Sequence, residues 1–143
     1  MNPSRETILD ALFALALTAG TFPTSSRRVM MVQEIADFPA LFLVSTASHF
    51  PPREARQLPP KRTLDTQIWV YTDVGKDPNA IPETALNTLL DAIEAALAPG
   101  VMSGVQTLGG LVSHAWIEGE IEQFPGVLDG VALAIIPVRV LVP

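Results

Sequence analysis

The segment Thr63–Thr72 constrains the fold more than any other part of the chain, because its side chains alternate along the whole segment. The set that suits a core is Leu64, Thr66, Ile68 and Val70. The alternate set, which faces the other way, is Asp65, Gln67, Trp69 and Tyr71. A period of two is typical of a β-strand that buries one face. The chain therefore needs a sheet and something to cover one side of it.

Two predicted helices can supply that cover. The first spans residues 3–19, with Asn2 as its cap, Pro3 in its first turn and Gly20 after its end. The second starts at Pro82 and stops before Pro99. Its apolar side chains form one stripe, made of Leu86, Leu89, Leu90, Ile93 and Leu97. We expect both helices to pack on the sheet.

The first helix is apolar around most of its circumference. The residues concerned are Ile8, Leu9, Leu12, Phe13, Leu15 and Leu17. Two interpretations stay open. A neighbouring subunit could cover part of this surface, with Leu9 and Phe13 in the contact. Alternatively, the helix could lie deep in the core of its own chain.

The remaining strands are predicted at Arg28–Val32, Ala40–Thr46, Val112–Phe124 and Val131–Val142. The apolar alternation of the last strand changes phase in the middle, which we interpret as a bulge next to Pro137. The element order is then α-β-β-β-α-β-β. It predicts an α/β (α+β) fold with a single mixed, mostly antiparallel sheet of about five strands and two helices, in one domain covering residues 1–143.

Composition excludes several classes of function. A chain of 143 residues with 48% apolar residues has the size of one domain with one core. Its net charge of -6 argues against tight binding of nucleic-acid phosphates, which depends on clustered Lys and Arg. The absence of cysteine rules out disulfides, a thiolate nucleophile and a thiolate metal site.

Residues with catalytic chemistry are few and scattered. His49 and His114 are far apart in the sequence and lack a carboxylate partner at ligand spacing. Ser113 precedes His114, but no G-x-S-x-G sequence is present. The stretch GVQTLGG lacks the Lys-Ser or Lys-Thr of a phosphate loop. We therefore expect no catalytic, cofactor-binding or metal-binding residues, and a protein that is not an enzyme.

Two charged segments are candidates for contacts with other molecules. A basic segment between prolines contains Arg53, Arg56, Lys61 and Arg62. It is either a solvated loop or a stiff arm that docks on an acidic surface. One acidic candidate is a strip on one face of the strand at 112–124, formed by Glu118, Glu120 and Glu122, and the other is the outer face of the second helix with Asp91 and Glu94. Such carboxylates can equally protect a solvated sheet edge from aggregation.

The order of these segments resembles a family over nearly the whole chain. The segments are RETILDALFALALTAG, RRVMMVQEIADFPALFLV, RTLDTQIWVYTD, ALNTLLDAIEAALAPG, LGGLVSHAWIEGEIE and VALAIIPVRVLV. Together they look like the tail terminator proteins of long-tailed bacteriophages. These are also called tail completion proteins, of the minor tail protein U type. The insertion PPREARQLPP and the glycine-rich stretch 100–110 match no motif of that family.

The resemblance implies a structural virion protein. Copies of a small α/β domain would form a ring, usually of six, that caps the tail tube and stops its polymerisation. The ring would also offer an interface to the head connector. The implied partners are further copies of the chain, the tail tube protein and the head-tail connector, with DNA only as the passing genome and no membrane. The implied location is the head-proximal end of the virion tail, after assembly in the host cytoplasm.

Two other interpretations remain. The nearer one is another head-tail joining or neck protein of the virion, built on a similarly small domain. The more distant one is a small cytosolic ligand-binding or catalytic α/β domain. That function would need a concave pocket with converging polar groups.

Overall fold

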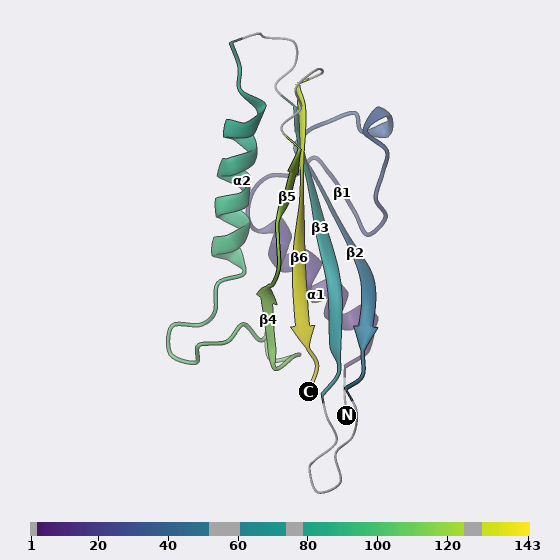
Figure 1. Cartoon of the computed structure of the whole chain (residues 1–143), viewed down its shortest axis with the longest axis vertical. Coiled ribbons are helices and arrows are strands. Elements are labelled where there is room, and N and C mark those ends of the chain that lie inside the picture. The colour runs from purple at the N-terminus through teal and green to yellow at the C-terminus, as the bar shows by residue number, and fades with distance from the viewer. Residues whose placement is uncertain (1–2, 52–60, 74–78, 125–129) are drawn as a thin grey trace, which may run out of the picture.

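The computed structural model describes residues 3–51, 61–73, 79–124 and 130–143. Figure 1 shows a tall, twisted sheet with helices behind it and beside it. In chain order the elements are α1 (Arg5–Leu17), β1 (Thr24–Ser26), the 3-10 helix η1 (Val32–Glu34), β2 (Ala40–His49), β3 (Thr63–Asp73), α2 (Pro82–Ala96), β4 (His114–Ile117), β5 (Glu122–Phe124) and β6 (Val131–Leu141).

The strands form one mixed sheet in the order β1-β2-β3-β6-β4, and β5 also pairs with β6. The short β1 runs parallel to β2, whereas every other pair is antiparallel. The predicted α+β class with a mixed, mostly antiparallel sheet is therefore confirmed. The sheet has six strands, where the sequence predicted about five.

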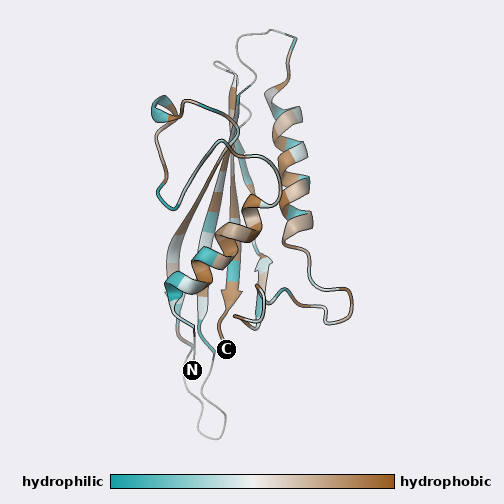
Figure 2. Cartoon of the chain, turned by 180° about the vertical axis from the view of Figure 1, so that it is seen from behind, coloured by the Kyte–Doolittle hydropathy of each residue, from teal (hydrophilic) through white to brown (hydrophobic). Residues whose placement is uncertain are grey.

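Both helices cover the same face of the sheet (Figure 2). Helix α1 starts at Arg5, two residues later than predicted, because its cap is Ser4 where the sequence predicted Asn2: the Ser4 hydroxyl accepts a hydrogen bond from the Thr7 N–H at 3.1 Å. Helix α2 begins at Pro82 as predicted, where the missing N–H of proline costs nothing.

The main core lies between this face and the helices. Its fully buried members include Ile8 and Leu12 of α1, Leu86 and Ile93 of α2, Leu41 and Leu43 of β2, Ile68 and Val70 of β3, and Ile136, Val138 and Val140 of β6. Leu9 is 4% exposed and belongs to the same core, so its side chain is not offered to a neighbouring subunit. Phe13 is half-buried against the core. Leu9 therefore fits the interpretation in which the helix lies in the core of its own chain. A subunit contact through Phe13 stays a prediction.

A second, smaller cluster covers one end of the opposite face. It is built from Ile35, Ala40, Phe42 and Tyr71. The rings of Phe42 and Tyr71 meet edge to face, with their centroids 5.9 Å apart. The chain between β1 and β2 packs Val29, Met30 and Val32 on this cluster. The predicted strand at Arg28–Val32 is therefore wrong, because its apolar residues pack as part of a connection and pair with no strand.

The predicted bulge in the last strand is also wrong. Strand β6 pairs with β3 in one unbroken register, from Val131 opposite Asp73 to Leu141 opposite Thr63. The irregularity lies on the other side of β6, where the predicted strand at 112–124 is interrupted between β4 and β5. Pro137 faces this interruption and accepts a hydrogen bond from the Glu118 N–H at 3.2 Å. Proline has no N–H to donate, so the neighbouring strand can leave the ladder here.

Candidate functional site on the open sheet face

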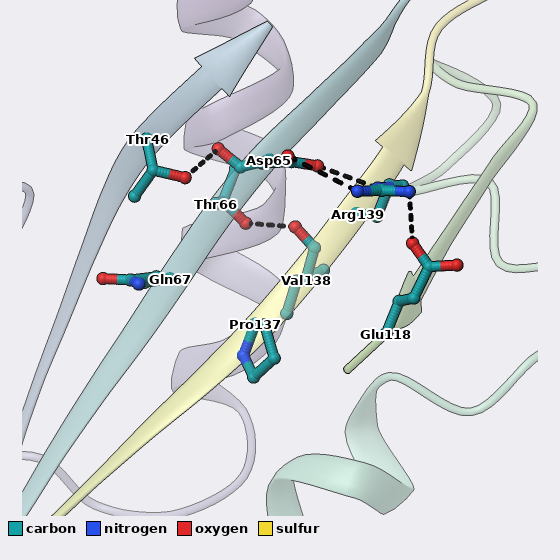
Figure 3. Close-up of a pocket in the computed structure, with 8 residues that line it drawn as sticks. All are labelled: Thr46, Asp65, Thr66, Gln67, Glu118, Pro137, Val138 and Arg139. Atoms are coloured by element: carbon teal, nitrogen blue, oxygen red, sulfur yellow. Dashed lines mark hydrogen bonds and ion pairs between the residues drawn. The ribbon is translucent and has the colours of Figure 1, made fainter. Parts of the chain in front are cut away.

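The part of the sheet that neither the helices nor the second cluster cover carries a polar hollow of about 190 Å³. Figure 3 shows the hollow between neighbouring strands, with Arg139 between two carboxylates. The residues that line it are Thr46, Asp65, Thr66, Gln67, Glu118, Pro137, Val138 and Arg139. We call this region the open face.

Asp65 and Arg139 lie at the centre of an ion network on this face. The Arg139 Nε donates to Asp65 Oδ1 at 2.8 Å, and the His49 Nε2 lies 2.7 Å from Asp65 Oδ2. A second nitrogen of the same guanidinium, Nη1, pairs with a carboxylate oxygen of Glu118. The network therefore joins β2, β3, β6 and the residue that follows β4.

The register of the sheet produces this network. Asp65 of β3 lies directly opposite Arg139 of β6, and Arg139 in turn lies opposite Trp116 of β4. Directly opposed charges of unlike sign stabilise a strand pair. The Asp65 backbone carbonyl also accepts a hydrogen bond from the Thr46 hydroxyl at 3.2 Å. Thr46 lies where the β2 register shifts between Ser45 and Ala47, so the bulge turns this hydroxyl toward β3.

The network changes the acidity of Asp65. Burial by itself would raise the pKa of Asp65, but hydrogen bonds from Arg139 and His49, together with their charges, outweigh that effect and lower it. The hydrogen bond to Asp65 likewise raises the pKa of Arg139. Both groups therefore keep their charges over the ordinary pH range, and the guanidinium is already engaged by two carboxylates. This arrangement suits a fixed, charged contact surface.

The predicted acidic strip does not form as one row. Glu118 lies after the end of β4 and pairs with Arg139, whereas Glu120 and Glu122 are exposed and pair with no cation in the described part of the chain. The reason is Gly119, whose φ of 103° turns the backbone out of the strand conformation. Glu118 thus already has a partner within its own chain.

The predicted basic segment is only partly described. Arg53 and Arg56 lie outside the described residues. The Lys61 ammonium donates to the Ser113 hydroxyl at 2.9 Å, and the Arg62 carbonyl accepts from the Val142 N–H at 2.9 Å. Lys61 and Arg62 therefore fix the start of β3 against the segments before β4 and after β6. A docking role for this segment stays a prediction.

The sequence did not identify Asp65 and Arg139 as a site, and it gave His49 no carboxylate partner. His49 in fact contacts Asp65, which is on a different strand. The available signal was one charge on the polar face of each of two strands, Asp65 on β3 and Arg139 on β6. Only the strand register shows that these two charges lie opposite each other. His114 has another environment: its Nδ1 accepts from the Gln106 N–H at 3.0 Å, and its ring stacks on Trp116 at a centroid distance of 4.9 Å.

Comparisons with known proteins add no assignment. No protein-family model matches the sequence, and no curated protein matches it either. Within the described ranges, no helix is long and apolar enough to cross a membrane. The same residues contain no group of three or more His, Cys, Asp or Glu side chains that could hold a metal ion. The function must therefore be inferred from the fold and from the surfaces of this chain.

Proposed function

We propose that this protein is a tail terminator of a long-tailed bacteriophage. Six copies form a ring that caps the tail tube, stops its polymerisation and contacts the head connector. The observation that carries the proposal is the architecture: a small α+β domain with one mixed sheet, of the kind that the resemblance to this family implies. The activity is assembly, without a reaction or a cofactor.

The open face supports this proposal because its charges are held in place before any partner arrives. Arg139, Asp65 and Glu118 belong to different segments and fix one another's positions. A preorganised charged surface loses little conformational entropy on docking and favours correctly oriented partners. Its hollow of about 190 Å³ is smaller than the roughly 300–1,000 Å³ typical of sites for small ligands. A protein surface is therefore the better match.

Ring closure needs two different surfaces on each copy, because a heterologous contact joins the front of one subunit to the back of the next. The exposed carboxylates Glu120 and Glu122 offer an acidic surface at one edge of the sheet. The basic segment that includes Arg53, Arg56, Lys61 and Arg62 lies between β2 and β3 in the sequence, and at its described end Lys61 contacts Ser113, directly before β4. Charge complementarity between the two would set partner choice and register in the ring.

The test is a mass measurement of the purified protein, alone and with the tail tube protein. We expect a closed ring on the tube, visible by electron microscopy as a cap. Changing Arg53, Arg56, Lys61 and Arg62 to Glu should abolish the cap while circular dichroism stays unchanged. Converting Glu120 and Glu122 to Lys in the same variant should restore it if the contact lies between subunits. A strict monomer with no cap on the tube would refute the proposal.

A further inference from the structure

The connection between α2 and β4 holds two aliphatic side chains completely in solvent. Val101 is 101% exposed and Met102 is 98% exposed, more than any other large apolar residue in the described part of the chain. An adjacent pair of fully exposed apolar side chains is costly in water and typical of a contact site. Methionine also adapts its shape readily to a partner surface. We call this pair the apolar tip.

The apolar tip is carried by a turn with its own hydrogen bonds. The Gly100 N–H donates to the Val105 carbonyl and the Gly104 N–H donates to the Gly100 carbonyl, both at 2.9 Å. The side-chain amide of Gln106 donates to the Ala98 carbonyl at 2.9 Å and ties the turn to the end of α2. These bonds hold Val101 and Met102 in a defined position. The backbone of the tip therefore loses little entropy when the tip docks.

An apolar hollow of about 310 Å³ lies beside this turn, between the end of α2 and β4. Its walls are Glu94, Leu97, Ala98, Pro99, His114, Ala115, Trp116 and Ile117. The ring of His114 stacks on the ring of Trp116 in this lining, with their centroids 4.9 Å apart. We call this hollow the edge groove. Most of its lining is apolar, so an aliphatic side chain would be better stabilised there than water.

The apolar tip and the edge groove belong to one end of the sheet. Figure 1 shows the connection after α2 looping out beside β4, which is the last strand in the sheet order. A surface patch that carries both a projection and a matching hollow is complementary to itself. In two copies related by a two-fold axis, the apolar tip of each copy can then fill the edge groove of the other.

We propose that the edge groove binds the apolar tip of a second copy of this chain, and that the two copies dock reciprocally around a two-fold axis. Val101 and Met102 of each copy enter the groove of the other and cover Trp116. Each copy thereby removes its most exposed apolar side chains from water. The two-fold contact uses the same patch on both copies, whereas ring closure uses two different surfaces of each copy. It therefore does not rest on the proposed function.

The first test is sedimentation velocity across a concentration series. The unchanged protein should form dimers as its concentration rises. The double variant Val101→Asp, Met102→Asp should weaken the dimer by at least about a hundredfold, because two apolar side chains are lost from each of two grooves. Both residues are fully exposed, so circular dichroism should stay the same. The control Met31→Asp changes an exposed methionine on the β1–β2 connection and should leave dimerisation unchanged.

The second test uses the absence of cysteine, which gives each single-cysteine variant one thiol. Met102→Cys protein and Ala98→Cys protein, marked by different tags, are mixed and mildly oxidised. We expect mixed disulfide dimers in clear excess over dimers of either variant alone, because the tip of one copy meets the groove of the other.

Three results would overturn the proposal. The unchanged protein could stay monomeric at every concentration, or the Asp double variant could dimerise as well as the unchanged one. The double variant could also keep its dimer and lose only its binding to the tail tube protein, which would make the tube the occupant of the groove. A dimer that persists where no ring forms on the tube supports the pairing and contradicts the proposed function alone.

Discussion

The two faces of the sheet are built from the same strands and do different things. On the helix-covered face, β6 places Ala132, Ala134, Ile136, Val138 and Val140, all buried. On the opposite face, the alternate residues of β6 are only half-buried: Val131 and Leu133 pack on the second cluster, whereas Pro137 and Arg139 lie on the open face. Because neighbouring residues point to opposite faces, each strand contributes to both surfaces. Stability therefore depends mainly on one face, and contacts with partners can be changed on the other.

The sharpest test of this difference uses two neighbouring isoleucines. Ile136 is fully buried on the helix-covered face, whereas Ile135 is half-buried on the open face. We expect Ile136→Ala to lower the free energy of unfolding by about 2–5 kcal/mol, since it leaves a cavity in the core. Ile135→Ala should cost about 1 kcal/mol, because water can fill the space. Urea unfolding of the two variants measures both. Equal losses would mean that the open face is a second core.

The helix-covered face is also the part of the fold that the sequence predicts well. The alternation at Thr63–Thr72 and the single apolar stripe of α2 depend only on neighbouring residues, so they can be recognised without knowing the pairing. The open face is different. Asp65 and Arg139 meet only because β3 and β6 pair in one particular register, and that register is set by the whole sheet.

The failed predictions have the same cause. Val29, Met30 and Val32 cover one end of the sheet, and a pattern of apolar residues does not distinguish such a segment from a strand. The phase change near Pro137 was assigned to β6, but the break lies in the partner strand, between Ile117 and Glu122. Sequence patterns report which residues are buried. They do not report which of two paired strands is interrupted so that those residues become buried.

The break between β4 and β5 gives the second prediction. Gly119 has a φ of 103°, where a side chain strains the backbone, although a Cβ there would lie at an ordinary 3.7 Å from Pro137 Cγ. We expect Gly119→Ala to destabilise the fold by about 1–3 kcal/mol. The matched control is Gly20→Ala, whose Cβ would meet Leu89 at 3.5 Å without such a φ.

Gly20→Ala should change stability by less than about 1 kcal/mol in either direction. The comparison is made by thermal unfolding, followed by the exchange rate of the Glu118 amide proton. Faster exchange in Gly119→Ala alone would show that the strain opens the hydrogen bond to Pro137. If both glycine variants behave alike, the break is not held by this backbone conformation.

The smallest expected effect tests whether the ion network on the open face is a structural pair or only a surface feature. The pKa of Asp65 is lower in the folded chain than in the unfolded one, because Arg139 and His49 favour its charged form. Between the two pKa values the unfolded chain therefore binds more protons. The stability that Asp65 contributes is complete above its unfolded pKa, about 4, and is lost as the pH falls through the lower folded value.

Asp65→Asn removes the pH dependence of stability that comes from Asp65 and keeps the shape of the side chain. We expect a loss of about 1 kcal/mol at pH 7, since the pair is partly exposed to solvent. The loss should shrink as the pH falls below about 4, because the unchanged protein then loses the same interaction. Denaturant titrations at pH 7, 5 and 3 measure this convergence, and Asp91→Asn on the exposed surface of α2 is the control. A constant difference between Asp65→Asn and the unchanged protein at all three pH values would show that the charge of Asp65 adds nothing to the fold. The open face would then owe its arrangement to the strand register alone.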